Sequence, residues 1–140
     1  MWNKHLEYNG ASHCKVIPFP VDTRWNSWFN SISYIAEVLD YLKSFFLYHC
    51  EAWKDSENVI KVMSLINNDV VFEDIRIKLW FTAESTKTLV SHLESFQARK
   101  SCATEYYHQL NLIRTYLELG TSKPFIGPKT KLLLEKIYIN

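Results

Sequence analysis

The sequence predicts an all-α protein, an irregular bundle of four or five helices with one long N-terminal helix over about residues 23–48. Two observations lead to this prediction. No glycine lies between Gly10 and Gly120, and no proline lies between Pro20 and Pro124. A fold of many β-strands needs turn residues about every 8–12 positions. A stretch of this length without glycine or proline therefore favours helices. In addition, apolar side chains recur at helical spacing along most of that stretch.

The composition is that of one globular domain. A chain of 140 residues fits a single domain, and a hydrophobic fraction of 47% excludes intrinsic disorder. The net charge is +1, with 16 basic and 15 acidic residues, so no overall field draws the chain to nucleic acid or to a membrane. The longest apolar run, near Phe45–Leu47, is far too short to cross a bilayer. We therefore expect no membrane partner, and any contact with DNA must come from a local patch.

The first segment, residues 1–22, is expected to be an extended arm, and residues 23–140 to be the helical domain. Pro18 and Pro20 fix their own φ angles and push the residues before them out of the helical region. Asp22 follows as a candidate N-cap, because its carboxylate can accept hydrogen bonds from free amides in the first helical turn.

The helix predicted over residues 23–48 has the clearest periodicity in the chain. Its apolar positions are spaced by three and four residues, which places them on one face of a helix. They are Trp25, Trp28, Phe29, Ile32, Ile35, Ala36, Leu39, Leu42, Phe45 and Phe46.

Two further helices are predicted before residue 101. Ser56 is expected to cap one over about residues 56–67, and the run Asn67–Asn68–Asp69 to end it and cap the next. That next helix keeps its apolar period to about Lys100. The stretch 75–81 alternates in a way that also suits a strand; we prefer a helix, since no turn signal closes such a strand.

The last two predicted helices cover about residues 102–119 and 129–138. The first carries an apolar face of Tyr106, Leu110, Ile113 and Leu117, with Gly120 as the residue that ends it.

No arrangement in the sequence points to catalysis or to a metal. The pairs His13–Cys14 and His49–Cys50 are adjacent residues, whereas paired zinc ligands are usually two to four residues apart. There is no Gly-x-Ser-x-Gly motif and no glycine-rich phosphate loop. Scattered helical carboxylates, Glu84 among them, are interpreted as solvated faces and ion pairs, and Glu73 and Asp74 are expected to pair locally with Arg76 and Lys78. We therefore expect no enzyme, no cofactor and no small-molecule substrate.

The local group with the most chemistry is the run Thr23–Arg24–Trp25–Asn26–Ser27 at the predicted start of the long helix. Helix N-termini bind phosphate, arginine pairs with phosphate, and tryptophan stacks on unpaired bases. Arg24 and Trp25 are therefore candidate DNA-binding residues. The alternative is that Trp25 is a core residue of an apolar stripe and that Arg24 is merely exposed.

This run, preceded by a proline-rich extended segment and followed by a long amphipathic helix, resembles the hAT superfamily of DNA transposases over about residues 16–48. In that family the same block opens a large α-helical region inserted into a ribonuclease-H-like catalytic domain. The resemblance implies DNA as a partner, a role for Trp25 in holding a cleaved DNA end, and a nuclear location. Family members place two catalytic aspartates before the block and a glutamate after the insertion, and the chain has no counterpart of this acidic triad.

The sequence thus leads to one main hypothesis and one alternative. The first is a catalytically inactive, truncated hAT-transposase-like helical fragment with residual DNA binding. The second is a helical protein–protein interaction module with no nucleic-acid contact. In either case the apolar segments at the two ends, 16–21 and 137–139, are expected to drive self-association, because they have lost the sheet that would cover them.

Overall fold

The computed structural model describes residues 1–11, 17–18, 25–53, 55–97, 103–122 and 125–139. This part of the chain contains six α-helices, one short 3-10 helix and no strand, which confirms the predicted all-α class. The α-helices are α1 (Trp2–Tyr8), α2 (Trp25–His49), α3 (Glu57–Ile66), α4 (Asp69–Gln97), α5 (Ala103–Ser122) and α6 (Pro128–Ile139), and the 3-10 helix is η2 (Cys50–Trp53). None of these helices is both long and apolar enough to cross a membrane.

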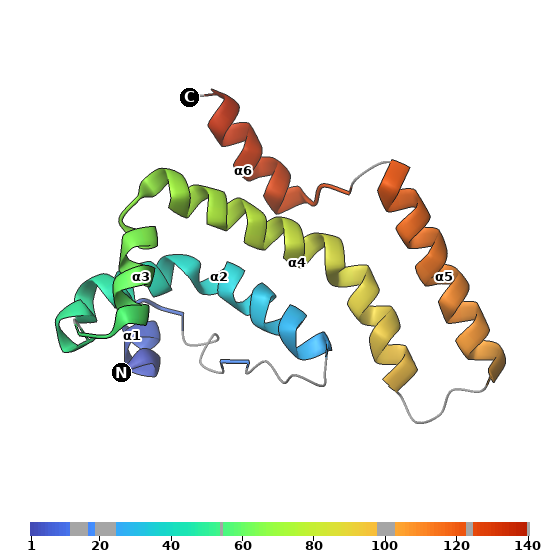
Figure 1. Cartoon of the computed structure of the whole chain (residues 1–140), viewed down its shortest axis with the longest axis horizontal. Helices are drawn as coiled ribbons and strands as arrows, with labels where there is room; N and C mark the ends of the chain where they lie inside the picture. Colours follow the sequence, from blue (N-terminus) through green and yellow to red (C-terminus); the bar gives the residue numbers. More distant parts are fainter. Residues whose placement is uncertain (12–16, 19–24, 54, 98–102, 123–124, 140) are drawn as a thin grey trace.

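Helices α2 and α4 form the centre of the molecule and run antiparallel, side by side (Figure 1). Ion pairs link them at one end: Arg76 binds Asp40 through both terminal nitrogens, at 2.6 and 2.9 Å, and Lys43 binds Asp69 at 2.9 Å. Helix α3 turns the chain from one to the other, while α5 and α6 pack against α4.

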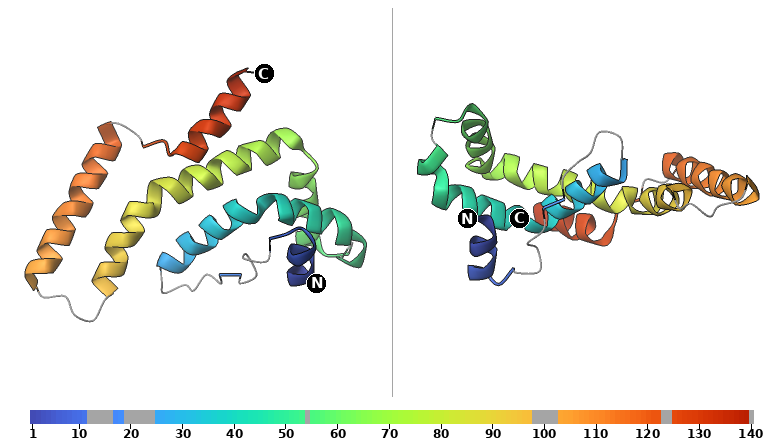
Figure 2. Two further views of the ribbon diagram at one scale, coloured as in Figure 1. Left: turned by 180° about the vertical axis from the view of Figure 1, so that it is seen from behind. Right: turned by 90° about the horizontal axis from the view of Figure 1, so that it is seen from below.

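The molecule is flat: it is broad in the view of Figure 1 and forms a thin layer in the view from below in Figure 2. It exposes 10,432 Å² of surface. A compact monomer of 16.6 kDa is expected to expose about 7,600 Å². The helices therefore lie in an open arrangement in which several faces stay in contact with solvent.

The buried side chains form two small clusters on α2. Leu39 packs with Ile66 of α3 and Phe72 of α4. On another side of α2, Val38 packs with Leu6 and Ala11, and both Val38 and Leu6 are fully buried.

The second cluster corrects the expectation of an extended arm over residues 1–22. Residues Trp2–Tyr8 form helix α1, which packs against α2. The Trp2 indole N–H donates to the Tyr34 hydroxyl at 3.0 Å, and the Trp2 ring meets Phe45 edge to face at 5.3 Å. Gly10, with φ of 74°, turns the chain after α1 so that Ala11 enters the cluster. The arm was predicted from the prolines at 18 and 20, and their restriction does not extend back to this segment.

Helix α4 contains 29 residues and is longer than α2, so the long helix that the sequence predicted is neither the first nor the longest. The alternative of a strand over residues 75–81 is wrong, because this stretch lies within α4. The helix bends along its length (Figure 1). Within this helix, Thr82 and Thr86 donate their hydroxyls to the carbonyls four residues earlier, and such hydrogen bonds are a known cause of helix bending.

The predicted helix ends were correct in part. Asn68 caps α4, since its side-chain oxygen accepts the amide of Val71 at 3.2 Å. Ser56 occupies the N-cap position of α3 without a capping side-chain hydrogen bond. Gly120 does not end its helix: α5 continues to Ser122, and the φ angle of Gly120 is not positive.

Candidate functional site

The two DNA-binding candidates stand where α2 begins. Arg24 lies outside the described residues, and so does the side chain of Trp25, although Trp25 is the first residue of α2. Asn26, the next residue of the block, is buried. The described groove residues nearest this block lie one turn further along α2, at Phe29 and Asn30.

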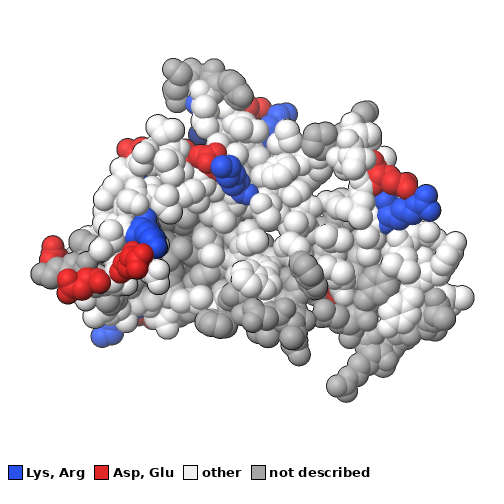
Figure 3. Space-filling view, viewed as in Figure 1, with Lys and Arg blue, Asp and Glu red and all other residues white. Residues whose placement is uncertain are grey.

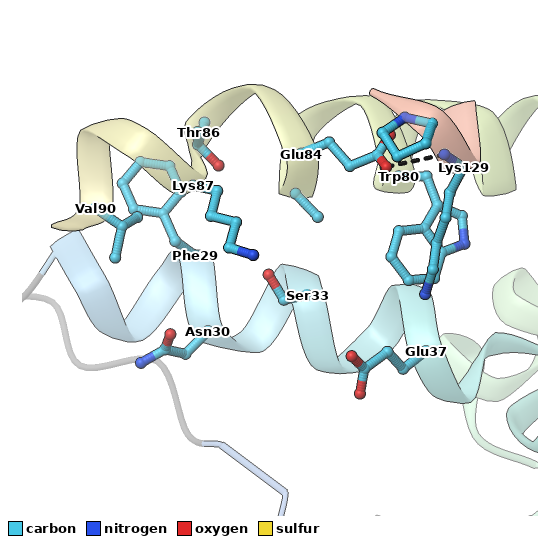
Figure 4. A pocket seen from close by; sticks show the side chains of 12 residues that line it. Phe29, Asn30, Ser33, Glu37, Trp80, Glu84, Thr86, Lys87, Val90 and Lys129 are labelled. Atoms are coloured by element: carbon cyan, nitrogen blue, oxygen red, sulfur yellow. Dashed lines mark hydrogen bonds between the residues drawn. The ribbon is translucent and has the colours of Figure 1, made fainter. Parts of the chain in front are cut away.

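At that point a groove of about 450 Å³ opens between α2 and α4 and is closed at one side by the start of α6 (Figure 4). Its size is in the usual range for ligand pockets. Its lining comes from three helices: Phe29, Asn30, Ser33 and Glu37 of α2; Trp80, Ala83, Glu84, Thr86, Lys87 and Val90 of α4; Pro128 and Lys129 of α6.

One end of the groove is held together by Glu84. Its carboxylate accepts three hydrogen bonds from the first turn of α6: the amide of Lys129 at 2.9 Å, the amide of Thr130 at 3.0 Å and the Thr130 hydroxyl at 2.7 Å. These bonds satisfy two of the amides that a helix start leaves free, and the negative charge lies at the positive end of the helix dipole. Gly127 is required beside them, since a Cβ there would overlap the Glu84 side chain.

The pKa of Glu84 reflects this arrangement. Partial burial raises the pKa of the carboxyl, but the Thr130 hydroxyl, the two amides and the charge of Lys129 outweigh it and hold the pKa below the ordinary glutamate value. Glu84 therefore stays charged and fully engaged with α6. Nothing in the sequence indicated this partner, because it lies 45 residues away along the chain.

Trp80 and Lys129 complete this end. The Lys129 ammonium lies 3.7 Å from the centroid of the Trp80 ring, within the range of a cation–π contact.

At the opposite end of the groove, nearer the start of α2, fewer of the polar side chains are engaged in contacts between helices. Figure 4 shows Lys87 extending into the groove toward Ser33, with Phe29 and Val90 beside it. Among the described residues Lys87 forms no ion pair, whereas Lys78, on the same helix, binds Asp74 at 2.6 Å. This end thus offers an ammonium group, an aromatic ring and two neutral hydrogen-bonding side chains, Asn30 and Ser33.

The face of the molecule in Figure 3 is largely uncharged, and on it lysines and arginines lie beside aspartates and glutamates. Several of these are ion pairs within one helix, such as Arg114 with Glu118 at 2.7 Å. The expected local pairing of Glu73 and Asp74 with Arg76 and Lys78 is confirmed, at 3.3 and 2.6 Å. Binding of a polyanion would therefore have to be local.

A serine–histidine pair lies between α1 and α2. Ser44 Oγ is 2.8 Å from His5 Nε2 and 3.0 Å from the carbonyl oxygen of Tyr41. The hydrogen bond between His5 and Ser44 fastens α1 to α2.

Metal-binding groups are not assembled in the part of the chain that the structure describes, where no three His, Cys, Asp or Glu side chains converge. His13, Cys14 and Cys102 lie outside that part.

No protein-family model, curated protein or solved structure matches the chain. The resemblance to hAT transposases is thus confined to the block at residues 23–27 and its flanks.

The groove residues on α4 and α6 were missed by sequence reasoning. In the sequence, Trp80 is one apolar position of a long helical pattern, and Lys129 is one of several C-terminal lysines. Only the packing of α6 on α4 brings these two together. The one available signal was Phe29 and Asn30, which lie two and three residues after the block.

Proposed function

We propose that this protein is a non-catalytic helical module related to the insertion region of hAT transposases, and that it binds single-stranded DNA where α2 begins. The observation that carries the proposal is the position of the groove, one helical turn beyond Trp25 and lined at that end by Phe29 and Lys87. On this proposal, the protein acts in the nucleus.

The chemistry of this end suits one unpaired nucleotide and its phosphates. Lys87 supplies a cation for phosphate, and Phe29 supplies a ring against which a base can stack. Asn30 and Ser33 can donate hydrogen bonds to base or sugar. Arg24 and Trp25 would extend this surface with a second cation and a second aromatic ring.

The small net charge of the chain determines how strongly we expect it to bind DNA. Two phosphate contacts, to Arg24 and Lys87, give a slope of log K against log salt of about −1.4 for a single strand. Binding should therefore be weak and mildly salt-dependent, unlike that of a strongly basic protein.

The test is a titration of a fluorescent single-stranded oligonucleotide at two salt concentrations. Lys87→Gln and Trp25→Ala should each weaken binding, the latter by about 1–3 kcal/mol, the usual contribution of one stacked base. The matched controls are Lys78→Gln on the same helix and Trp28→Ala one turn further along α2, which should bind as the parent does. If the controls weaken binding as much as the test variants do, the site is wrong.

The absence of catalysis is part of the proposal. With no counterpart of the acidic triad, nothing would hold the two metal ions that in-line phosphoryl transfer requires. We expect no DNA cleavage with Mg²⁺ or Mn²⁺. Cleavage that a single Asp or Glu substitution abolishes would contradict this.

A protein–protein interaction module without DNA contact is the second candidate. It is favoured by the open helical layer, whose 10,432 Å² of surface exceeds that of a compact monomer by roughly a third. A titration in which no oligonucleotide binds at low salt would support this candidate over the first.

A further inference from the structure

The groove between α2 and α4 is lined by two glutamates, and only one of them is held by the fold. Glu84 accepts three hydrogen bonds from the start of α6. Glu37, on α2, is exposed and forms no hydrogen bond or ion pair with the other described residues. Figure 4 shows its side chain on the same wall as Ser33, toward the end of the groove that holds Trp80. This end therefore offers two carboxylate oxygens that can accept hydrogen bonds from a ligand.

A carboxylate lowers the affinity of a site for nucleic acid unless it meets donors of the ligand. Its charge repels the phosphates that Lys87 would attract. It carries only acceptors, and its two oxygens can receive two parallel hydrogen bonds. Within a DNA strand the donors are the N–H groups of the bases, because the phosphates and the linked sugars carry none. Glu37 is therefore matched to the edge of a base and not to the backbone.

The four bases differ in the donors on their Watson–Crick edges, which are open to contact only in an unpaired strand. Guanine has two adjacent donors there, N1–H and N2–H. Adenine and cytosine have one amino donor next to a ring nitrogen that is an acceptor, and thymine has one N–H between two carbonyls. Acceptors repel a carboxylate oxygen, so guanine alone matches both oxygens of Glu37 at once.

The position of Glu37 assigns this contact to a second nucleotide. Glu37 lies eight residues after Phe29, which is about 12 Å along α2 at 1.5 Å per residue. A base stacked on Phe29 is therefore out of reach of Glu37, and the base that meets Glu37 belongs to another nucleotide of the same strand. Trp80 lines this end of the groove, so an aromatic ring is available beside that base.

We propose that Glu37 gives the groove a preference for guanine, by accepting hydrogen bonds from N1–H and N2–H of an unpaired guanine base at the Trp80 end. This inference rests on the proposed binding of single-stranded DNA and adds to it the base that the site prefers. Glu37 is exposed, so its contribution lies at the lower limit for a bidentate contact, which is about fivefold in affinity for a correctly placed base.

The test is a titration of the full chain with fluorescent ten-nucleotide DNA strands at low salt. One strand is oligo-dT, and in the others thymine alternates with guanine, with inosine or with adenine. Guanine fills half of the positions in its strand, so that strand should bind about threefold more tightly than the adenine strand. Inosine keeps N1–H but lacks the amino group of guanine, and its strand should fall between the two. All three are purines, so stacking alone does not produce this order.

The role of Glu37 is tested by substitution. Glu37→Ala should remove the preference for guanine and should tighten the binding of oligo-dT slightly, because a repulsive charge is lost. Glu51→Ala is the matched control: Glu51 is an exposed glutamate of η2 outside the groove, so the same charge is removed while the preference for guanine stays. Circular dichroism of both variants checks that the helices are retained.

The outcomes separate this inference from the proposed function. Equal binding of the guanine and adenine strands by the parent would overturn the preference for guanine and leave the proposed DNA binding intact. A preference for guanine that Glu37→Ala retains, or that Glu51→Ala also loses, would overturn the role of Glu37. If none of the strands binds, the proposed function is wrong and this inference is wrong with it.

Discussion

The two ends of the chain use their apolar residues in opposite ways. Among the described residues, all eight buried hydrophobic side chains lie between Leu6 and Phe72, whereas residues 106–137 contribute none of these eight and carry ten large hydrophobic side chains that are exposed. Helix content is not the difference, because both regions are helical. The first region brings α1, α3 and the start of α4 around α2, while α5 and α6 pack mainly along α4.

This comparison shows that an amphipathic sequence does not by itself bury its apolar face. A helix needs neighbours on that face, and α2 has them because the connections on both sides of it fold back. Helix α5 has one main neighbour, α4, and contacts it through polar groups of Gln109 and Tyr116. We therefore expect the stability of the fold to depend mainly on the first region.

Phe72 should give the largest effect on stability. It is 4% exposed, and Lys43 and Arg76 lie over its ring at 4.4 and 5.2 Å. Phe72→Ala should lower the free energy of unfolding by about 3–5 kcal/mol, measured by urea denaturation. Phe81→Ala, on the same helix at 41% exposure, should cost less than about 1 kcal/mol. Equal losses of unfolding free energy for the two variants would contradict the contrast between buried and exposed apolar residues.

Leu6 tests whether α1 belongs to the stable region. Its side chain is fully buried against Val38, so Leu6→Ala should cost about 2–5 kcal/mol in the same denaturation experiment. Tyr8→Ala, in the same short helix at 91% exposure, should have almost no effect. A loss below about 0.5 kcal/mol for Leu6→Ala would mean that α1 is not part of the cooperative unit.

Glu84 tests the attachment of α6. Glu84→Gln removes the charge and weakens the hydrogen bonds to Lys129 and Thr130, so we expect a loss of about 1–2 kcal/mol near neutral pH. Glu94→Gln, an exposed position on the same helix, should cost little.

The pH dependence of this effect has a defined sign. The pKa of Glu84 is lower in the folded chain than in the unfolded chain, so its contribution is complete above the unfolded value of about 4.3. As the pH falls through the folded pKa, the contribution is lost and the stability difference between the parent and Glu84→Gln should shrink. If the stability difference between the parent and Glu84→Gln stays constant as the pH falls below the folded pKa of Glu84, the carboxylate charge plays no part in it.

The smallest effect is expected on α5. Leu119→Ala, at a residue 63% exposed, should change the free energy of unfolding by less than about 0.5 kcal/mol, measured at a concentration where the chain is monomeric. A loss above 2 kcal/mol would mean that α5 is buried in solution and that the contrast between the two regions does not hold.

Much of the secondary structure could be predicted from the sequence, because helices depend on local periodicity and local breaks. The absence of Gly and Pro between residues 20 and 120 indicated the all-α class, and the spacing of apolar residues placed α2 to within two residues. Asn68 was identifiable as a cap because capping involves groups only three residues apart. The prediction that Gly120 ends its helix was wrong, since a glycine allows a helix to end but does not force it to end.

The candidate site depends on contacts that no local pattern records. Glu84 reaches the amides of Lys129 and Thr130 across 45 and 46 residues, and Trp80 meets Lys129 only because α6 folds onto α4. The sequence established that this chain is a set of amphipathic helices carrying the Thr23–Ser27 block, because periodicity and composition act within a few residues. Which apolar faces are buried, and which helices line the groove, followed only from tertiary packing, because the free energy of burial depends on neighbours that are distant along the chain.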